Sequence, residues 1–170
     1  YSAIRLFENV GGLLRRSASV TADPLVKGAA EGNTKLNAFD LALLNAGVGD
    51  TNLVRMSSII PPSGELVDKI ELPKGALIPI AYAAIESDNP GEIISAAIGV
   101  GLPEHEGEPG LIMEFEDTRP LIEVEATVKQ MVIDGYAYRN RNYREILTLG
   151  VEHTVVDKGA VFAAAVLWYK

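Results

Sequence analysis

Residues 52–62, which read NLVRMSSIIPP, decide how the chain is organised. The stretch indicates a short apolar strand that reaches two adjacent serines, Ser57 and Ser58, before two prolines. Proline fixes φ and has no backbone N–H, so Pro61 and Pro62 end any central strand there. Two hydroxyl groups are therefore expected at a strand end. A Ser-Ser pair alone is equally consistent with two ordinary strand residues, so its meaning depends on the rest of the chain.

The 170-residue chain has the composition of one globular domain. Hydrophobic residues make up 48% and charged residues 22%, and the length is sufficient to bury a core. The chain has no cysteine, which excludes disulfides and thiolate metal sites. The formal net charge of −8 argues against nucleic acid as a partner, because that binding relies on Lys and Arg neutralising phosphates. It is compatible with a small cationic ligand.

The sequence gives no sign of a membrane partner or an export signal. No apolar run approaches the ~20 residues that span a bilayer. Arg15 and Arg16 follow the apolar N-terminal positions, which is the reverse of a signal peptide, so we expect a cytoplasmic protein. Residues 4–14 carry a partly helical apolar face broken by Gly11 and Gly12. That segment is either a packed N-terminal helix or an arm that contacts another subunit.

The hydrophobic pattern predicts these elements in the first half of the chain. Weak alternation over 17–30 indicates a strand interrupted at Pro24. Helical spacing over 36–46 predicts a helix that ends before Gly47. The strand over 52–60 follows, and then a loop rich in Pro, Gly and charge over 61–75.

The second half is predicted to be mainly β. Two long apolar segments, 76–87 and 92–102, are joined by the turn sequence DNPG and should form a hairpin. An acidic loop over 103–110 precedes a strand over 111–116, an amphipathic helix from about Leu121 to Val132, and strands over 146–156 and 160–169. Because strands come as hairpins rather than alternating with helices, we expect an α+β fold in a single domain over residues 1–170.

Three acidic residues, Asp40, Glu114 and Glu116, lie within apolar stretches, where ionised side chains are rare without a partner. Glu114 and Glu116 alternate along GLIMEFE and should share one side of a strand, with Met113 and Phe115 on the other. A carboxyl group in an apolar site has a raised pKa and can donate a proton near neutral pH. A strand with one solvated face has the same pattern, and spacing alone leaves both interpretations open.

The histidines and the glycine turn do not indicate a metal or nucleotide site. His105 lies between carboxylates but lacks partner ligands at helical or strand spacing, which favours a solvated side chain. His153 belongs to no recognisable Ser-His-Asp arrangement, so a structural role is favoured. The turn GVGD at 47–50 lacks the third glycine of a dinucleotide fingerprint, and no predicted strand precedes it.

Several blocks, taken in order and spacing, resemble the pyruvoyl-dependent arginine decarboxylase family. The blocks are LNAFD at 36–40, LLNAG at 43–47, NLVRMSSIIPP at 52–62, GLIMEFE at 110–116, VEHT at 151–154, FAAA at 162–165 and LWYK at 167–170. The resemblance runs from about Ser19 to Lys170, whereas the loop 103–109 departs from the family pattern in length or charge. It implies a four-layer αββα sandwich assembled as a homo-oligomer, either a trimer or a dimer of trimers.

The resemblance implies that Ser58 is the precursor of a covalent pyruvoyl group, with neither PLP nor a metal. Its hydroxyl would attack the carbonyl carbon of Ser57 to give an ester. β-Elimination would then split the chain, and hydrolysis of the resulting dehydroalanine would release ammonia and leave the pyruvoyl group. The products would be a β chain, residues 1–57, and an α chain, residues 58–170. Asn52 would help in this processing.

The resemblance also assigns a reaction. The pyruvoyl ketone would form a Schiff base with the α-amino group of L-arginine, and its adjacent carbonyl would serve as the electron sink for loss of CO₂. Glu114 would reprotonate the α-carbon to give agmatine. Asp40 would bind the guanidinium by paired hydrogen bonds, and the pocket, which a trimer would place between subunits, would be completed by Leu36, Leu43, Gly49, Thr51 and Asn52.

Two other functions remain open. Asp40 selects a cationic side chain without distinguishing arginine from lysine or ornithine, so the substrate can be another basic amino acid. The chain can also be a non-catalytic homologue that stays unprocessed, binds a cationic ligand or acts as a regulatory subunit. Cleavage between Ser57 and Ser58 distinguishes the classes. The presence of both serines and of Glu114 favours the enzyme.

Overall fold

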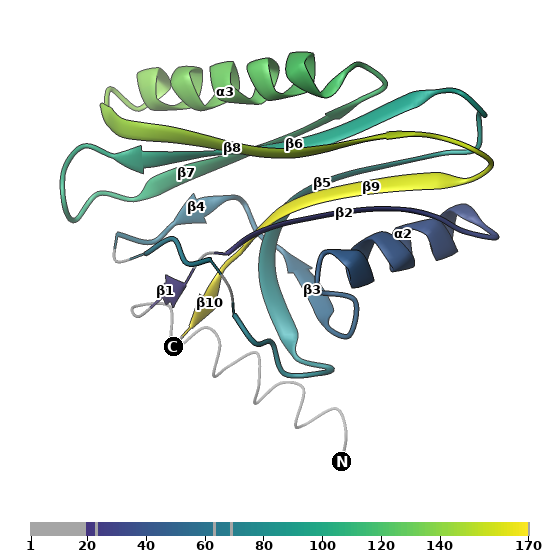
Figure 1. Cartoon of the computed structure of the whole chain (residues 1–170). Coiled ribbons are helices and arrows are strands. Elements are labelled where there is room, and N and C mark those ends of the chain that lie inside the picture. Colours follow the sequence, from purple (N-terminus) through teal and green to yellow (C-terminus); the bar gives the residue numbers. More distant parts are fainter. Residues whose placement is uncertain (1–19, 23, 63, 69, 170) are drawn as a thin grey trace.

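The computed structural model describes residues 20–22, 24–62, 64–68 and 70–169 (Figure 1). The predicted helical segment over 4–14 lies outside these residues. The described elements are strands β1 (Val20–Ala22), β2 (Leu25–Glu31), β3 (Asn52–Arg55), β4 (Ile59–Ile60), β5 (Leu77–Ser87), β6 (Ile93–Pro103), β7 (Gly110–Asp117), β8 (Tyr143–Thr154), β9 (Gly159–Val166) and β10 (Trp168–Tyr169), and helices α2 (Lys35–Asn45) and α3 (Leu121–Tyr138). The predicted α+β class is confirmed.

Two four-stranded sheets stack face to face, and β1 and β10 pair in a short ribbon. The first sheet has the order β2-β9-β5-β3 and packs against α2, so we call it the α2 sheet. The second has the order β4-β7-β6-β8 and packs against α3, so we call it the α3 sheet. Figure 1 shows α3 above its sheet and α2 below the other. All strand pairs are antiparallel except β3, which runs parallel to β5.

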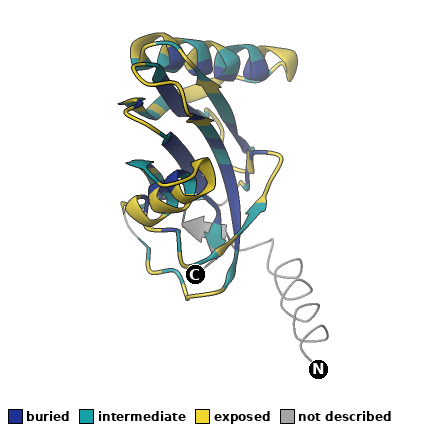
Figure 2. Cartoon of the chain, turned by 90° about the vertical axis from the view of Figure 1, so that its right-hand side faces the viewer, coloured by how far each residue is buried: buried dark blue, intermediate teal, exposed yellow. Residues whose placement is uncertain are grey.

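The core between the sheets follows from the alternation of side chains along each strand. The α3 sheet contributes large side chains such as Ile94 and Ile98, and the α2 sheet contributes small ones such as Ala81 and Ala163. The buried residues therefore gather between the sheets and on the helix faces turned toward them (Figure 2). Burial of this apolar surface is the main favourable contribution to folding.

Glycines of the two sheets face the helices and leave no room for a side chain at these contacts. A Cβ at Gly28 of β2 would lie 2.1 Å from the Ala42 carbonyl oxygen of α2, and a Cβ at Gly101 of β6 would lie 2.5 Å from the Tyr136 ring of α3. Either glycine is needed for the observed helix–sheet distance. The predicted end of α2 is also confirmed, because Gly47 follows it with φ of +80°.

The predicted hairpin over 76–87 and 92–102 is wrong. Both segments are strands, β5 and β6, but β5 pairs with β3 and β9 whereas β6 pairs with β7 and β8. The turn at 88–91 therefore carries the chain from one sheet to the other. The residues at 88–91 do favour a tight turn. They do not determine which strands pair with β5 and β6, because that depends on how the two sheets stack.

The predicted strands over 52–60 and 160–169 are each split. In the first, β3 belongs to the α2 sheet and β4 to the α3 sheet, with residues 56–58 crossing between them. In the second, β9 ends at Val166 and β10 pairs with β1. Leu167, which lies between them, donates its N–H to the Pro79 carbonyl at 2.9 Å. A continuous apolar run does not reveal a change of sheet.

Glu31, at the end of β2, fixes the turn that joins β8 to β9. Its carboxylate accepts the backbone N–H groups of Val156, Asp157 and Lys158 at 2.9–3.0 Å and lies 2.6 Å from His153 Nε2. Burial alone would raise the pKa of Glu31, but these hydrogen bonds outweigh it and lower the pKa to about 2. His153 therefore has the structural role that the sequence favoured. No helix in the described part of the chain is long and apolar enough to cross a membrane.

Candidate active site

Ser58 lies where the chain crosses from one sheet to the other. Met56 still donates its N–H to Ile80 of the α2 sheet at 3.0 Å, whereas the Ser58 carbonyl already accepts from Ile112 of the α3 sheet at 2.9 Å. The turn between these two anchors gives Ser58 a φ of +65°, in the left-handed region that costs L-residues energy. The Ser57–Ser58 peptide is therefore held in a constrained conformation.

The Ser58 hydroxyl donates a hydrogen bond to the Glu114 carboxylate. Pairing of β4 with β7, which sets Ile59 opposite Leu111, brings the two residues together. Glu114 lies on the side of β7 opposite Met113 and Phe115, which pack against the α3 side. The predicted alternation along β7 is therefore confirmed. Ser58 is 9% exposed and Glu114 is half-buried, so solvent weakens their interaction little.

A cavity of about 320 Å³ opens beside this pair, and we call it the Ser58 cavity. Its walls come from the crossing segment, from β7 and from the end of α3. It is lined by Arg55, Met56, Ser57, Ser58, Ile59, Leu111, Ile112, Met113, Glu114 and Arg139. The cavity therefore brings together three residues that the sequence singled out, namely both serines and Glu114.

Glu116 does not line the Ser58 cavity and is exposed at the surface. Partial removal of its carboxyl group from water raises the pKa of Glu116. The positive charge of Arg55 acts in the opposite direction, and the negative charge of Glu114 raises the pKa further. The charges of Arg55 and Glu114 thus act on Glu116, although its side chain does not line the cavity.

The other predicted pocket residues form a second group around α2 and the start of β3. Asp40 is exposed on α2, which corrects the apolar setting inferred from its neighbours, and Leu36 is 72% exposed. Thr51 donates its hydroxyl to the Val48 carbonyl at 2.7 Å, and the Asn52 amide donates to the Gly75 carbonyl at 2.9 Å. The group comprises Leu36, Asp40, Leu43, Gly49, Thr51 and Asn52.

Within one chain the two groups do not share a cavity. None of the second group lines the Ser58 cavity. Asn52 begins β3, whereas Ser58 follows its far end, and a four-residue strand extends about 13 Å. Asp40 and Ser58 therefore do not line a common cavity of the single chain.

Comparison with known proteins identifies the family. The family model described as pyruvoyl-dependent arginine decarboxylase (PvlArgDC) matches residues 24–169. The chain belongs to this family. A relative named pyruvoyl-dependent arginine decarboxylase from Methanocaldococcus jannaschii is 53% identical over 146 residues, which cover 86% of this chain and 88% of the relative. Relatives with the same name from Pyrococcus abyssi and Methanococcus vannielii are 47% and 43% identical, covering 85% and 86% of this chain and 92% and 89% of those proteins.

Membership of the pyruvoyl-dependent arginine decarboxylase family confirms the sequence resemblance, and the residues at the site fit its cofactor. A pyruvoyl group made from the chain needs a serine, or a similar residue, whose peptide bond is accessible to its own hydroxyl. Ser58 offers such a hydroxyl, at a turn of left-handed φ and hydrogen-bonded to a carboxylate. Ser57, on the other side of the bond, is exposed and lines the cavity.

Two arginines line the Ser58 cavity, and neither was predicted from the sequence to belong to the site. Arg55 ends β3 and Arg139 follows α3. Arg139 Nη1 donates to the Gly135 carbonyl at 2.9 Å, as a basic residue at a helix end commonly does. A single arginine after a helix is typical of a residue that binds the last carbonyl groups of the helix. The sequence therefore gave no signal that Arg139 reaches the cavity.

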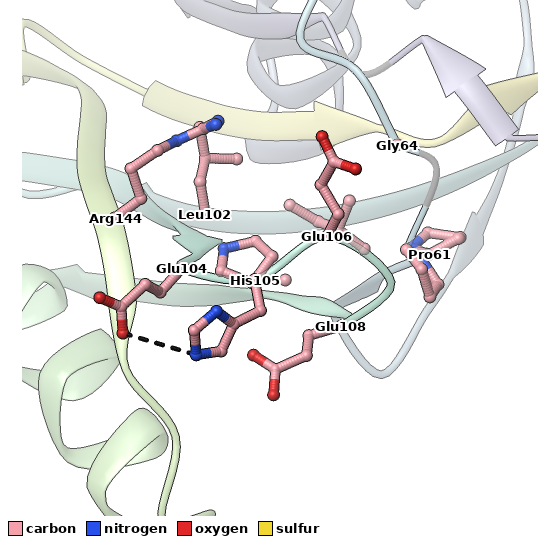
Figure 3. Close-up of a pocket in the computed structure, with 12 residues that line it drawn as sticks. Pro61, Gly64, Leu102, Glu104, His105, Glu106, Glu108 and Arg144 are labelled. Atoms are coloured by element: carbon pink, nitrogen blue, oxygen red, sulfur yellow. Dashed lines mark ion pairs between the residues drawn. The ribbon is translucent and has the colours of Figure 1, made fainter.

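A second, smaller cavity of about 130 Å³ lies under the acidic loop (Figure 3). His105 Nε2 lies 3.9 Å from Glu104, and Figure 3 shows the side chains of Glu106 and Glu108 pointing in different directions. Accordingly, the described residues contain no group of three or more His, Asp or Glu side chains arranged to hold a metal ion. Neither Ser58 nor Glu114 lines this cavity.

Proposed function

We propose that this protein decarboxylates L-arginine to agmatine and CO₂, using a pyruvoyl group made from Ser58. The observation that carries the proposal is the hydrogen bond from the Ser58 hydroxyl to Glu114 beside the Ser58 cavity, in a chain of this family. The hydroxyl would provide the cofactor, and the carboxyl group beside it would provide the proton that the reaction needs after CO₂ leaves.

Processing would begin when Ser58 Oγ attacks the carbonyl carbon of Ser57. A C–O bond would form and the C–N bond would break, giving an ester and a free amine at position 58. β-Elimination would then release residues 1–57 with the carboxylate of Ser57, and hydrolysis would convert dehydroalanine to the pyruvoyl group with loss of ammonia. The left-handed φ of Ser58 supports this route, since cleavage relieves a conformation that costs about 1–2 kcal/mol.

The pyruvoyl group would supply the electrophilic carbonyl and electron sink of the decarboxylation. Glu114 would hold a proton beside position 58 and deliver it to the α-carbon of the substrate. Its hydrogen bond with the Ser58 hydroxyl and its place in the wall of the Ser58 cavity support this role. The apolar side chain of Ile112, on the same side of β7 as Glu114, would limit access of water to the same point.

The guanidinium of the substrate would bind Asp40, with Leu36, Leu43, Gly49, Thr51 and Asn52 completing that end of the pocket. Because these residues lie away from the Ser58 cavity of their own chain, we propose a homo-oligomer, a trimer or a dimer of trimers, in which neighbouring copies complete each site. The same arrangement would bring Asn52 of one copy to the scissile peptide of another. The helix–sheet contacts described above support the four-layer αββα sandwich as its subunit.

The reaction itself tests the proposal. Purified protein should release CO₂ from L-arginine and form agmatine, measured by chromatography, and should act far more slowly on L-lysine and L-ornithine. Treatment with phenylhydrazine, which reacts with carbonyl groups, should abolish activity. If the chain is cleaved between Ser57 and Ser58 but decarboxylates none of these amino acids, the proposal is contradicted. If it prefers lysine or ornithine, that amino acid replaces arginine as the proposed substrate.

A further inference from the structure

We propose that Arg139 binds the α-carboxylate of the substrate in the Ser58 cavity. The inference rests on the proposed function, because it names the substrate group that this wall of the cavity takes. The wall carries one carboxylate, Glu114, and two guanidinium groups, Arg55 and Arg139. In a chain with a formal net charge of −8, such a positive surface at the reaction centre is suited to an anionic group.

Arg55 already has partners within the chain. Its guanidinium lies 4.7 Å from the centre of the Tyr82 ring, and Nη2 donates to the Tyr82 carbonyl at 3.1 Å. Burial raises the pKa of Glu116, and the positive charge of Arg55 offsets part of this rise. These contacts fix the side chain and compensate its charge, so Arg55 is less suited to a ligand than its neighbour.

Arg139 is in the opposite situation. The one side-chain hydrogen bond of Arg139 to a described residue goes to the Gly135 carbonyl, and in the described part of the chain its guanidinium forms no ion pair. A guanidinium has five N–H donors and stays charged at any physiological pH. Arg139 is exposed and lines the cavity, so its remaining donors are accessible to a molecule that enters.

The substrate has one group that fits. At neutral pH the α-carboxylate is the only anion of arginine, and it is bonded to the carbon that must lie between position 58 and Glu114. The carboxylate therefore has to occupy the Ser58 cavity. Arg139 would attract it and would also repel the substrate guanidinium, so that arginine enters with its α-carbon toward Ser58. Because the negative charge leaves as CO₂, this contact favours the bound substrate more than the transition state.

The substitution Arg139→Gln tests the inference, with Arg141→Gln as the matched control. Arg141→Gln removes the same charge near the same end of α3. The Arg141 side chain, however, donates to the Pro109 carbonyl at 2.9 Å and does not line the Ser58 cavity. Arg139→Gln should raise the KM for arginine about two- to fivefold, the size expected of an exposed charge pair, without lowering kcat. The inhibition constant of agmatine, which lacks the carboxylate, should stay constant or fall, and Arg141→Gln should change neither.

Calorimetry provides a reading that is independent of turnover. In the Ser58→Ala background, the ratio of arginine affinity to agmatine affinity should fall when Arg139 is replaced by Gln. Equal weakening of both ligands would indicate general damage to the cavity, and unchanged affinities for both would place the carboxylate elsewhere; either result overturns the inference. Both would leave the proposed function standing, whereas a cleaved wild-type protein that makes no agmatine would contradict that function itself.

Discussion

The Ser58 hydroxyl and the Glu114 carboxylate are joined by a hydrogen bond although 56 residues separate them in the chain. Their meeting depends on the crossing of residues 56–58 between the two sheets and on the pairing of β4 with β7. The same crossing gives Ser58 its left-handed φ. The residue that would become the cofactor and the residue that would donate the proton are thus positioned by one feature of the fold.

Replacing Ser58 should separate the chemistry of processing from the strain of the backbone. Ser58→Ala and Ser58→Gly should both remain single chains without activity, because neither has the attacking hydroxyl. Glycine adopts φ of +65° without strain whereas alanine adopts it at a cost, so the Gly variant should be more stable by about 1 kcal/mol. Gel electrophoresis and denaturant unfolding measure the two effects. Cleavage of either variant would remove Ser58 as the precursor, and equal stabilities would argue against strain.

The Glu114→Gln variant should cleave itself between Ser57 and Ser58 but should decarboxylate arginine slowly. The amide oxygen can still accept the hydrogen bond of the Ser58 hydroxyl, so cleavage at 57–58 should proceed. An amide cannot deliver the proton, and loss of a general acid lowers kcat by about 10²-fold or more. Glu116→Gln, which changes the exposed carboxylate two residues along β7, is the control and should keep kcat within a few fold. A rapid Glu114→Gln enzyme would mean that another group protonates the α-carbon.

Asp40→Ala should mainly affect substrate affinity. A charge-assisted hydrogen bond is worth about 1.5–3 kcal/mol, so its loss should raise the KM for arginine roughly 10- to 100-fold. Self-cleavage should be unchanged, because α2 lies away from the Ser58 cavity. Asp134→Ala removes an aspartate from α3 and should leave the KM as it is. If Asp40→Ala keeps a normal KM, the guanidinium binds elsewhere.

Glu31 should make folding stability depend on acid pH. Its pKa is lowered from 4.5 to about 2 in the folded protein, so its charged form contributes stability above pH ~4.5, and this contribution is lost as the pH falls toward about 2. Glu31→Gln should therefore destabilise the protein most above pH ~4.5, and the difference from wild type should shrink between pH 4.5 and 2. Unfolding by urea at several pH values measures it. A difference that grows as the pH falls would contradict this assignment.

Elements with strong local signals were predicted correctly, whereas strand partners were not. The spacing over 36–46 and the glycine at 47 are enough to define α2, because helix hydrogen bonds are local. The turn at 88–91 specifies a change of direction but not the sheet that each flanking strand joins, so β5 and β6 were wrongly paired. The split at 56–58 was missed for the same reason, since the run from Asn52 to Ile60 is apolar on both sides of the crossing.

The candidate site divides in a similar way. Period-two alternation along β7 correctly set Glu114 opposite Met113, because it depends on strand geometry alone. Proximity of Glu114 to Ser58 came only from the family resemblance, since no local pattern links β7 to the crossing. Arg139 gave no signal as a cavity residue. The surroundings of Asp40 were misjudged, because apolar neighbours on a helix do not determine which face is covered.

Intact-mass spectrometry of the purified protein under denaturing conditions tests the central claim most directly. We predict two chains, one ending at Ser57 and one beginning at position 58, the second having the mass of a pyruvoyl group in place of its N-terminal serine. A single uncleaved chain, or two chains of which the second keeps an N-terminal serine, would contradict the account and favour an unprocessed homologue that binds a cationic ligand.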